Sequence, residues 1–231
     1  MSERFDGLPL PELVLSAVGM ILVFSALENG LSPVTQQNPA HLIIFVVLCV
    51  LGAVATLFPR RCSPEIRVTG DLHTSRYTDV FGVRVIHGHH SDCSGFSNHE
   101  IRLGEKRICA GCLGLLAGSF MAIIIAVALA IQSVPVPPQS GPLGLAFVAV
   151  GLAYSVMIPG SPPVLRTVLN ALLVTGFSLV YLVLTGVRGL GLMGISLSIF
   201  WMYTRIRLSR WSHERLCAGC DEPCLEQMGG N

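Results

Sequence analysis

The sequence predicts an all-α fold, a polytopic bundle of about six transmembrane helices. Two features of the composition indicate a membrane protein: 52% of the 231 residues are hydrophobic and only 13% are charged, about half the charged fraction of a soluble domain. The third feature is a series of uncharged apolar stretches. Each is close to the roughly 20 residues that a helix needs to cross a bilayer.

Six stretches qualify as spans. Their predicted limits are 11–27, 42–58, 112–132, 143–158, 167–185 and 189–204. The uncharged region between Ile108 and Leu165 is too long for one helix, and prolines within 133–142 divide it, because proline breaks a helix interior. The first and last stretches are short, so five spans is the alternative count. No signal-peptide pattern is present, and we expect the first helix to be retained.

This count divides the chain into four regions: two spans (1–58), a loop (59–111), four spans (112–204) and a tail (205–231). The N-terminus, the loop, the turn at 159–166 and the tail then share one side. Of the 15 Lys and Arg residues, only Arg188 lies on the other side. The shared side has the rest: Arg4, Arg60, Arg61, Arg67, Arg76, Arg84, Arg102, Lys106, Arg107, Arg166, Arg205, Arg207, Arg210 and Arg215.

Basic loops face the cytoplasm. We therefore predict a multi-pass protein of the cell membrane with a cytoplasmic loop, a cytoplasmic tail and both termini in the cytoplasm. Within the loop, the β-branched run from Asp79 to Ile86 predicts a short strand or hairpin. In the third span, Gly114 and Gly118 form a Gly-x-x-x-Gly pair, which we interpret as ordinary helix packing.

Eight cysteines are present. Cys49 is most simply a small apolar residue of the second span, and Cys62 has no partner by spacing. The other six fall in two clusters with histidines. The first cluster contains His87, His89, His90, Cys93, His99, Cys109 and Cys112, and the second contains His213, Cys217, Cys220 and Cys224. Both clusters include the tetrapeptide Cys-Ala-Gly-Cys.

A Cys-x-x-Cys pair can place two thiolates on one tetrahedral zinc ion. Cytoplasmic thiols stay reduced, so a disulfide framework is not expected. A structural zinc site is the leading interpretation, and redox-active thiols, an iron or iron–sulfur centre and a catalytic metal are the alternatives. Either Cys109, Cys112, Cys217 and Cys220 share one ion, or each cluster binds its own.

The stretch from Cys93 to Gly114 resembles the family named Domain of Unknown Function 2085, which consists of small prokaryotic membrane proteins. In that family a Cys-His pair precedes a polar segment, and Cys-Ala-Arg-Cys-x-Gly then opens a helix. The matching residues are Cys93, Gly104, Cys109, Ala110, Cys112 and Gly114. Gly111 stands where the family has arginine, and Ser94 where it has histidine. The resemblance implies a membrane protein with a metal site and assigns no reaction.

We therefore expect a metal-binding membrane protein whose cytoplasmic site has a structural role or senses metal or redox state and contacts a protein partner. The alternative is an enzyme, a metal- or thiol-dependent oxidoreductase acting on a lipid-soluble or small substrate. A transporter ranks third, because the predicted span interiors contain almost no ionisable side chains. Besides the metal ion, the lipid bilayer is the expected partner. The net charge of +1 gives no reason to expect nucleic acid.

Overall fold

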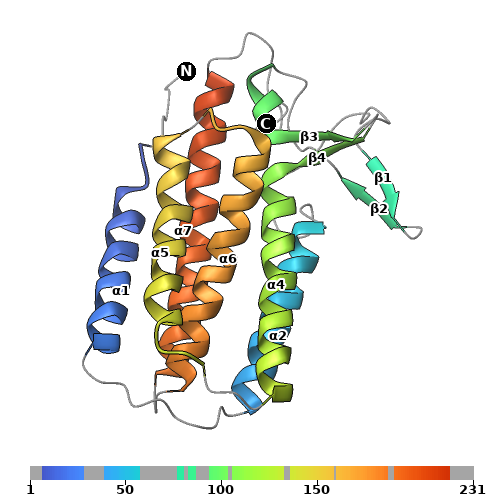
Figure 1. The fold of residues 1–231 in the computed structure, drawn as a ribbon. Coiled ribbons are helices and arrows are strands. Elements are labelled where there is room, and N and C mark those ends of the chain that lie inside the picture. The colour runs from blue at the N-terminus through green and yellow to red at the C-terminus, as the bar shows by residue number, and fades with distance from the viewer. Residues whose placement is uncertain are drawn as a thin grey trace, which may run out of the picture.

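The structure is a computed structural model that describes residues 7–28, 39–57, 77–80, 83–86, 94–103, 106–132, 136–158, 160–186 and 190–218. Within these ranges, six long helices lie side by side as a bundle (Figure 1). They are α1 (Leu10–Glu28), α2 (Pro39–Leu57), α4 (Ala110–Gln132), α5 (Ser140–Met157), α6 (Pro163–Thr185) and α7 (Gly191–Ala218).

Five of these helices, α1, α2, α4, α5 and α6, are long and apolar enough to cross a membrane. The chain is therefore an integral membrane protein with a mostly helical fold. The sixth predicted span lies in the first half of α7, but α7 continues as one helix to Ala218. Its second half contains four arginines, so the helix as a whole is less apolar than the other five.

Successive helices run in alternating directions (Figure 1). As a result α4 and α6 begin at the same end of the bundle at which α5 and α7 finish. We call this the cysteine end, because Cys109 and Cys112 lie at the start of α4. The described residues of the turn between α5 and α6 lie at this end as well (Figure 1).

Close helix contacts surround α6. A Cβ at Gly118 would lie 2.7 Å from the Val174 side chain, and one at Gly114 would lie 2.8 Å from the Cβ of Asn170. Gly144 of α5 and Gly176 of α6 approach similarly, each facing the other's carbonyl oxygen. The Gly-x-x-x-Gly pair of the third span is thus a packing surface for α6 within the chain, as predicted.

The apolar core forms two clusters. One joins α1, α5, α6 and α7 around residues such as Val148, Leu173 and Trp201, all fully buried. The other joins α2, α4 and α6, where the Phe45 ring stacks on Tyr181 with centroids 5.0 Å apart. The outer faces of α1 and α2 expose large apolar side chains, as expected of surfaces that contact lipid.

Two antiparallel hairpins precede α4. β1 (Tyr77–Val80) pairs with β2 (Val83–Ile86), which agrees with the strand or hairpin predicted there. A 3-10 helix, η2 (Ser94–His99), leads into β3 (Glu100–Leu103), which pairs with β4 (Lys106–Cys109). The second hairpin was not predicted. It matters for the site because its last residue is Cys109.

Candidate functional site

The first Cys-Ala-Gly-Cys element spans the junction between a strand and a membrane helix. Cys109 ends β4, and Cys112 lies in the first turn of α4. Both side chains are partly exposed and neither forms a disulfide. The two thiols are hydrogen-bonded to each other.

Gly111, between the two cysteines, faces polar groups from two other helices. A Cβ at this position would lie 3.9 Å from Cys109 Sγ, 3.9 Å from Asn170 Nδ2 and 4.0 Å from Arg205 Nη2. The thiol pair therefore lies beside an amide of α6 and a guanidinium of α7. The glycine leaves space for these neighbours, since any side chain would contact all three.

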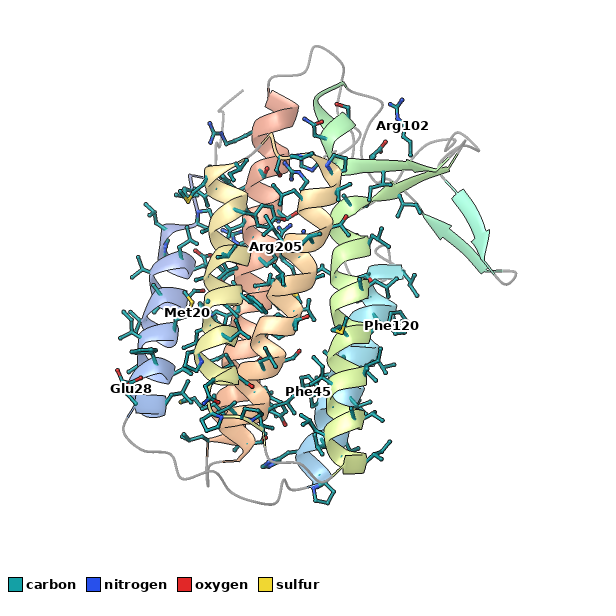
Figure 2. All side chains as sticks on the ribbon, in the orientation of Figure 1. Met20, Glu28, Phe45, Arg102, Phe120 and Arg205 are labelled. Atoms are coloured by element: carbon teal, nitrogen blue, oxygen red, sulfur yellow. The ribbon has the colours of Figure 1, made fainter. Side chains whose placement is uncertain are left out.

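Tyr154 of α5, Asn170 of α6 and Arg205 of α7 form what we call the buried polar network. Figure 2 labels Arg205, which lies inside the bundle toward the cysteine end. Arg205 donates from Nε to Asn170 Oδ1 at 2.8 Å and from Nη2 to the Tyr154 hydroxyl at 2.9 Å. Asn170 Nδ2 donates to the same hydroxyl at 2.7 Å. The exposed fractions are 4%, 0% and 8% for Tyr154, Asn170 and Arg205. Three helices are thus joined by hydrogen bonds inside the bundle.

A second arginine, Arg166, lies in the same region. It is 7% exposed, donates from Nε to the Ser161 carbonyl at 3.2 Å and lies 3.5 Å from Nδ1 of His99. It is within electrostatic reach of Tyr154, Arg205 and Cys109. The cysteine end therefore contains two guanidinium groups withdrawn from water.

A hydrogen bond also joins the start of α4 to α6. The Thr167 hydroxyl donates to the carbonyl of Ala110 at 3.0 Å, so a side chain of α6 is directly linked to the backbone between the two cysteines. Asn170 Nδ2 also donates to the Arg166 carbonyl at 2.7 Å. These bonds fix the thiol pair relative to the buried polar network.

Of the predicted ligands, Cys109, Cys112 and His99 lie together at the cysteine end. His213 and Cys217 lie on the last turns of α7, where the structure describes the backbone. The others fall outside the described residues: His87, His89, His90, Cys93, Cys220 and Cys224. Within the described part, no three His, Cys, Asp or Glu side chains gather so that they could hold a metal ion.

Four residues of the site were not predicted: Tyr154, Arg166, Asn170 and Arg205. The two arginines lie one residue outside the predicted spans, and we counted them with the surface charge. The sequence contains a signal for them, since Asn170 is an amide inside an apolar stretch, and polar groups at such depth face protein rather than lipid. Arginines that border the predicted spans, as Arg166 and Arg205 do, are natural partners for such an amide.

The chain matches no family model, no curated protein and no solved structure. The resemblance around Cys109 therefore stays an expectation, and the chemistry of the site has to be argued from its own residues. These are two adjacent thiols, two buried guanidinium groups, a phenol, an amide and an imidazole.

Proposed function

We propose that the chain is a membrane protein with a metal site, most simply for zinc, at the cysteine end, and that Cys109 and Cys112 supply two of its ligands. The observation that supports this is the hydrogen-bonded contact between the two thiols. Two thiolates on one tetrahedral zinc lie about 3.8 Å apart, given Zn–S bonds of about 2.3 Å. Sulfurs already in contact need little rearrangement to accept an ion.

The remaining ligands would come from segments that join the bundle at the same end. Cys93 and one of His87, His89 and His90 precede Glu100, the first residue of the second hairpin, by 7 to 13 residues in the sequence. His99 is less suitable, because its Nδ1 lies 3.5 Å from Nη1 of Arg166. A set of three cysteines and one histidine is a common structural zinc site.

The continuation of α7 argues for separate sites in the loop and the tail. Cys217 follows Arg205 by about twelve helical residues, which corresponds to roughly 18 Å along the helix axis. Arg205 is the residue of α7 that reaches the Cys109–Cys112 pair. We therefore propose that His213, Cys217, Cys220 and Cys224 bind their own ion. A metal there would also order the tail, because binding free energy becomes folding free energy.

Zinc analysis of the purified protein tests the first site. We expect the Cys109→Ser/Cys112→Ser variant to lose one zinc ion per chain and to melt at a lower temperature. Cys49→Ala is the matched control, because Cys49 is 7% exposed in α2 and has no proposed role as a ligand. The proposal fails if the double variant keeps the wild-type zinc content, or if the control loses as much.

A thiol oxidoreductase is the second candidate, because Cys109 and Cys112 form an adjacent pair of reduced thiols. Disulfide formation between Cys109 and Cys112 would release two electrons and two protons to a lipid-soluble two-electron acceptor such as a quinone. Treatment of the metal-free protein with a water-soluble quinone should then form this disulfide and yield one hydroquinone per chain. Reduction that also occurs in the double serine variant would exclude this function.

We further propose that the cysteine end faces the cytoplasm and that six helices span the membrane. The charge distribution in the sequence supports the orientation. After zinc is chelated, a membrane-impermeant maleimide should label Cys217 only in permeabilised cells. Labelling in intact cells would reverse the orientation.

A further inference from the structure

The hydroxyl of Tyr154 has both of its acceptor sites occupied. It accepts one hydrogen bond from Asn170 Nδ2 and one from Arg205 Nη2. A phenol oxygen accepts about two such bonds and still has its own proton to donate. Among the described residues no acceptor receives that proton, although the side chain is only 4% exposed. A buried donor of this kind calls for a partner.

Arg205 shows the same surplus of donors. Two of its N–H groups donate, to Asn170 Oδ1 and to Tyr154, and a guanidinium has five. Its described partners are neutral, while the side chain is only 8% exposed. A charge withdrawn from water without an opposite charge is unfavourable by several kcal/mol. The acceptor that Arg205 lacks should therefore be an anion.

Other groups near Arg205 also favour a bound anion. Arg166 adds a second positive charge within reach of both Tyr154 and Arg205. The hydroxyl of Ser161, whose backbone carbonyl accepts from Arg166, is buried and has no hydrogen-bond partner in the described structure. The hydroxyl of Ser155, next to Tyr154 in α5, is in the same condition. Unpaired polar groups at a native site indicate a bound water or ion.

We propose that Arg205 and Tyr154 bind a phosphate group at the cysteine end of the bundle. The forked N–H groups of arginine match the oxygens of phosphate, and the phenol proton adds a donor at the same point. Tyr154 lies one helical turn from the end of α5 and Cys112 in the first turn of α4. The site is thus near the depth of lipid headgroups, where basic sites between helices bind phospholipids. The ligand is therefore either a lipid headgroup or free phosphate.

The site uses none of the proposed metal ligands, so it is independent of the proposed function. The competing explanation is internal: an ionised Cys112, which is within electrostatic reach of Arg205, would supply the missing negative charge. In that case phosphate would bind only when the thiol is removed.

Melting curves of the protein in phospholipid-free micelles test the proposal, with inorganic phosphate as one probe and phosphatidic acid as the other. Diacylglycerol, which lacks the phosphate, is the control for the lipid tails. We expect phosphatidic acid or inorganic phosphate to raise the melting temperature and diacylglycerol to have no effect. A response to phosphatidic acid alone identifies a lipid headgroup, and a response to both probes identifies a site open to free phosphate.

Tyr154→Phe should weaken the affinity for the active probe, as determined from its concentration dependence, about tenfold. This change corresponds to the loss of one charge-assisted hydrogen bond. Tyr181→Phe is the matched control, since Tyr181 is equally buried and its hydroxyl donates to the His41 carbonyl in the other core cluster. Arg205→Gln should abolish the response, whereas Arg207→Gln should retain it. If Arg205→Gln does not fold, Arg205→Lys, which keeps the charge and loses the fork, should still weaken binding.

Three results would overturn the proposal: no response of the wild type to either probe, equal responses of Tyr154→Phe and Tyr181→Phe, or a response that appears only in Cys109→Ser/Cys112→Ser. The last result would identify the thiolate as the counter-ion of Arg205.

Discussion

α6 and α2 are similar in sequence character and opposite in environment. Both are long and apolar enough to span a membrane, yet 61% of the apolar window of α6 is buried within the protein against 17% for α2. Apolarity does not distinguish them, because lipid and protein interior are equally apolar. The difference lies in the polar side chains, since α6 contains Arg166, Asn170 and Ser178, each of them hydrogen-bonded.

This contrast shows where information about function resides in such a chain. An unpaired polar group in hydrocarbon is unfavourable by several kcal/mol, so the polar residues of a span mark the side covered by other helices. In α6, Arg166 and Asn170 lie toward the cysteine end, where the thiol pair also lies. Substitutions of buried residues that contact other helices should therefore lower the stability of the protein more than substitutions elsewhere.

The largest effect should follow Asn170→Leu. Asn170 is fully buried and bonds Arg205, Tyr154 and the Arg166 carbonyl. An apolar side chain of similar volume would leave the guanidinium of Arg205 without this partner. We therefore expect the free energy of unfolding to fall by about 2–3 kcal/mol. Ser178→Ala is the control, because Ser178 is also fully buried but bonds only a carbonyl of its own helix. Denaturant titrations in detergent that gave equal losses would refute the special role of the network.

Gly114→Ala should cause the next largest loss of stability. A Cβ at Gly114 would lie 2.8 Å from the Cβ of Asn170 and still closer to the Thr167 carbonyl. Neither neighbour is the flexible end of a side chain, so α4 and α6 must separate, with a loss of about 2 kcal/mol. At Gly52 of α2 the nearest atom, Ser119 Oγ, would be 3.9 Å from the new Cβ. There alanine should be neutral or stabilising by up to about 1 kcal/mol, and a loss at Gly52 as large as at Gly114 would contradict the account.

A pair of substitutions within α2 tests its two faces. Phe45 is 5% exposed and stacks on Tyr181, whereas Leu51 is 59% exposed. We expect Phe45→Ala to lower stability by about 1–2 kcal/mol through lost packing, because burial from lipid adds no hydrophobic gain. Leu51→Ala should change the unfolding free energy by less than about 0.5 kcal/mol. If the two losses were reversed, the assignment of the lipid-facing side would be wrong.

The smallest effect should be that of Glu12→Gln. Glu12 of α1 lies 3.3 Å from Arg207 of α7, and the arginine side chain is 36% exposed. Partly solvated ion pairs contribute at most about 1 kcal/mol, and salt weakens them further. The loss measured at low ionic strength should therefore shrink at 0.5 M salt. A salt-independent loss would indicate that the pair is more deeply buried than its exposure implies.

The helices were predictable because each comes from an uncharged apolar stretch that proline or charge interrupts. Their limits agree with the structure within a few residues. α7 continues past Arg205, because residues of its basic second half, such as Leu208, still pack against the bundle. The hairpin Glu100–Cys109 was not predicted, although Ile101 and Leu103 alternate with polar residues in a strand-like way.

Of the residues at the candidate site, Cys109, Cys112 and His99 were predicted from the sequence. Spacing alone pairs Cys109 with Cys112, since both sulfurs lie on one short turn. The network beside them joins three helices. Residues as far apart in the sequence as Tyr154 and Arg205 show no spacing pattern that would predict their contact. Arg166 and Arg205 resembled the ordinary basic residues at the ends of membrane helices. Packing of α5, α6 and α7 is what withdraws them from water.

X-ray absorption at the zinc edge tests the central claim most directly, that Cys109 and Cys112 bind a metal at the cysteine end. The account predicts a sulfur shell at about 2.3 Å in the purified protein, with fewer sulfur ligands per bound zinc ion or less zinc in Cys109→Ser/Cys112→Ser. A wild-type protein without zinc, or with only nitrogen and oxygen ligands at about 2.0–2.1 Å, would contradict it.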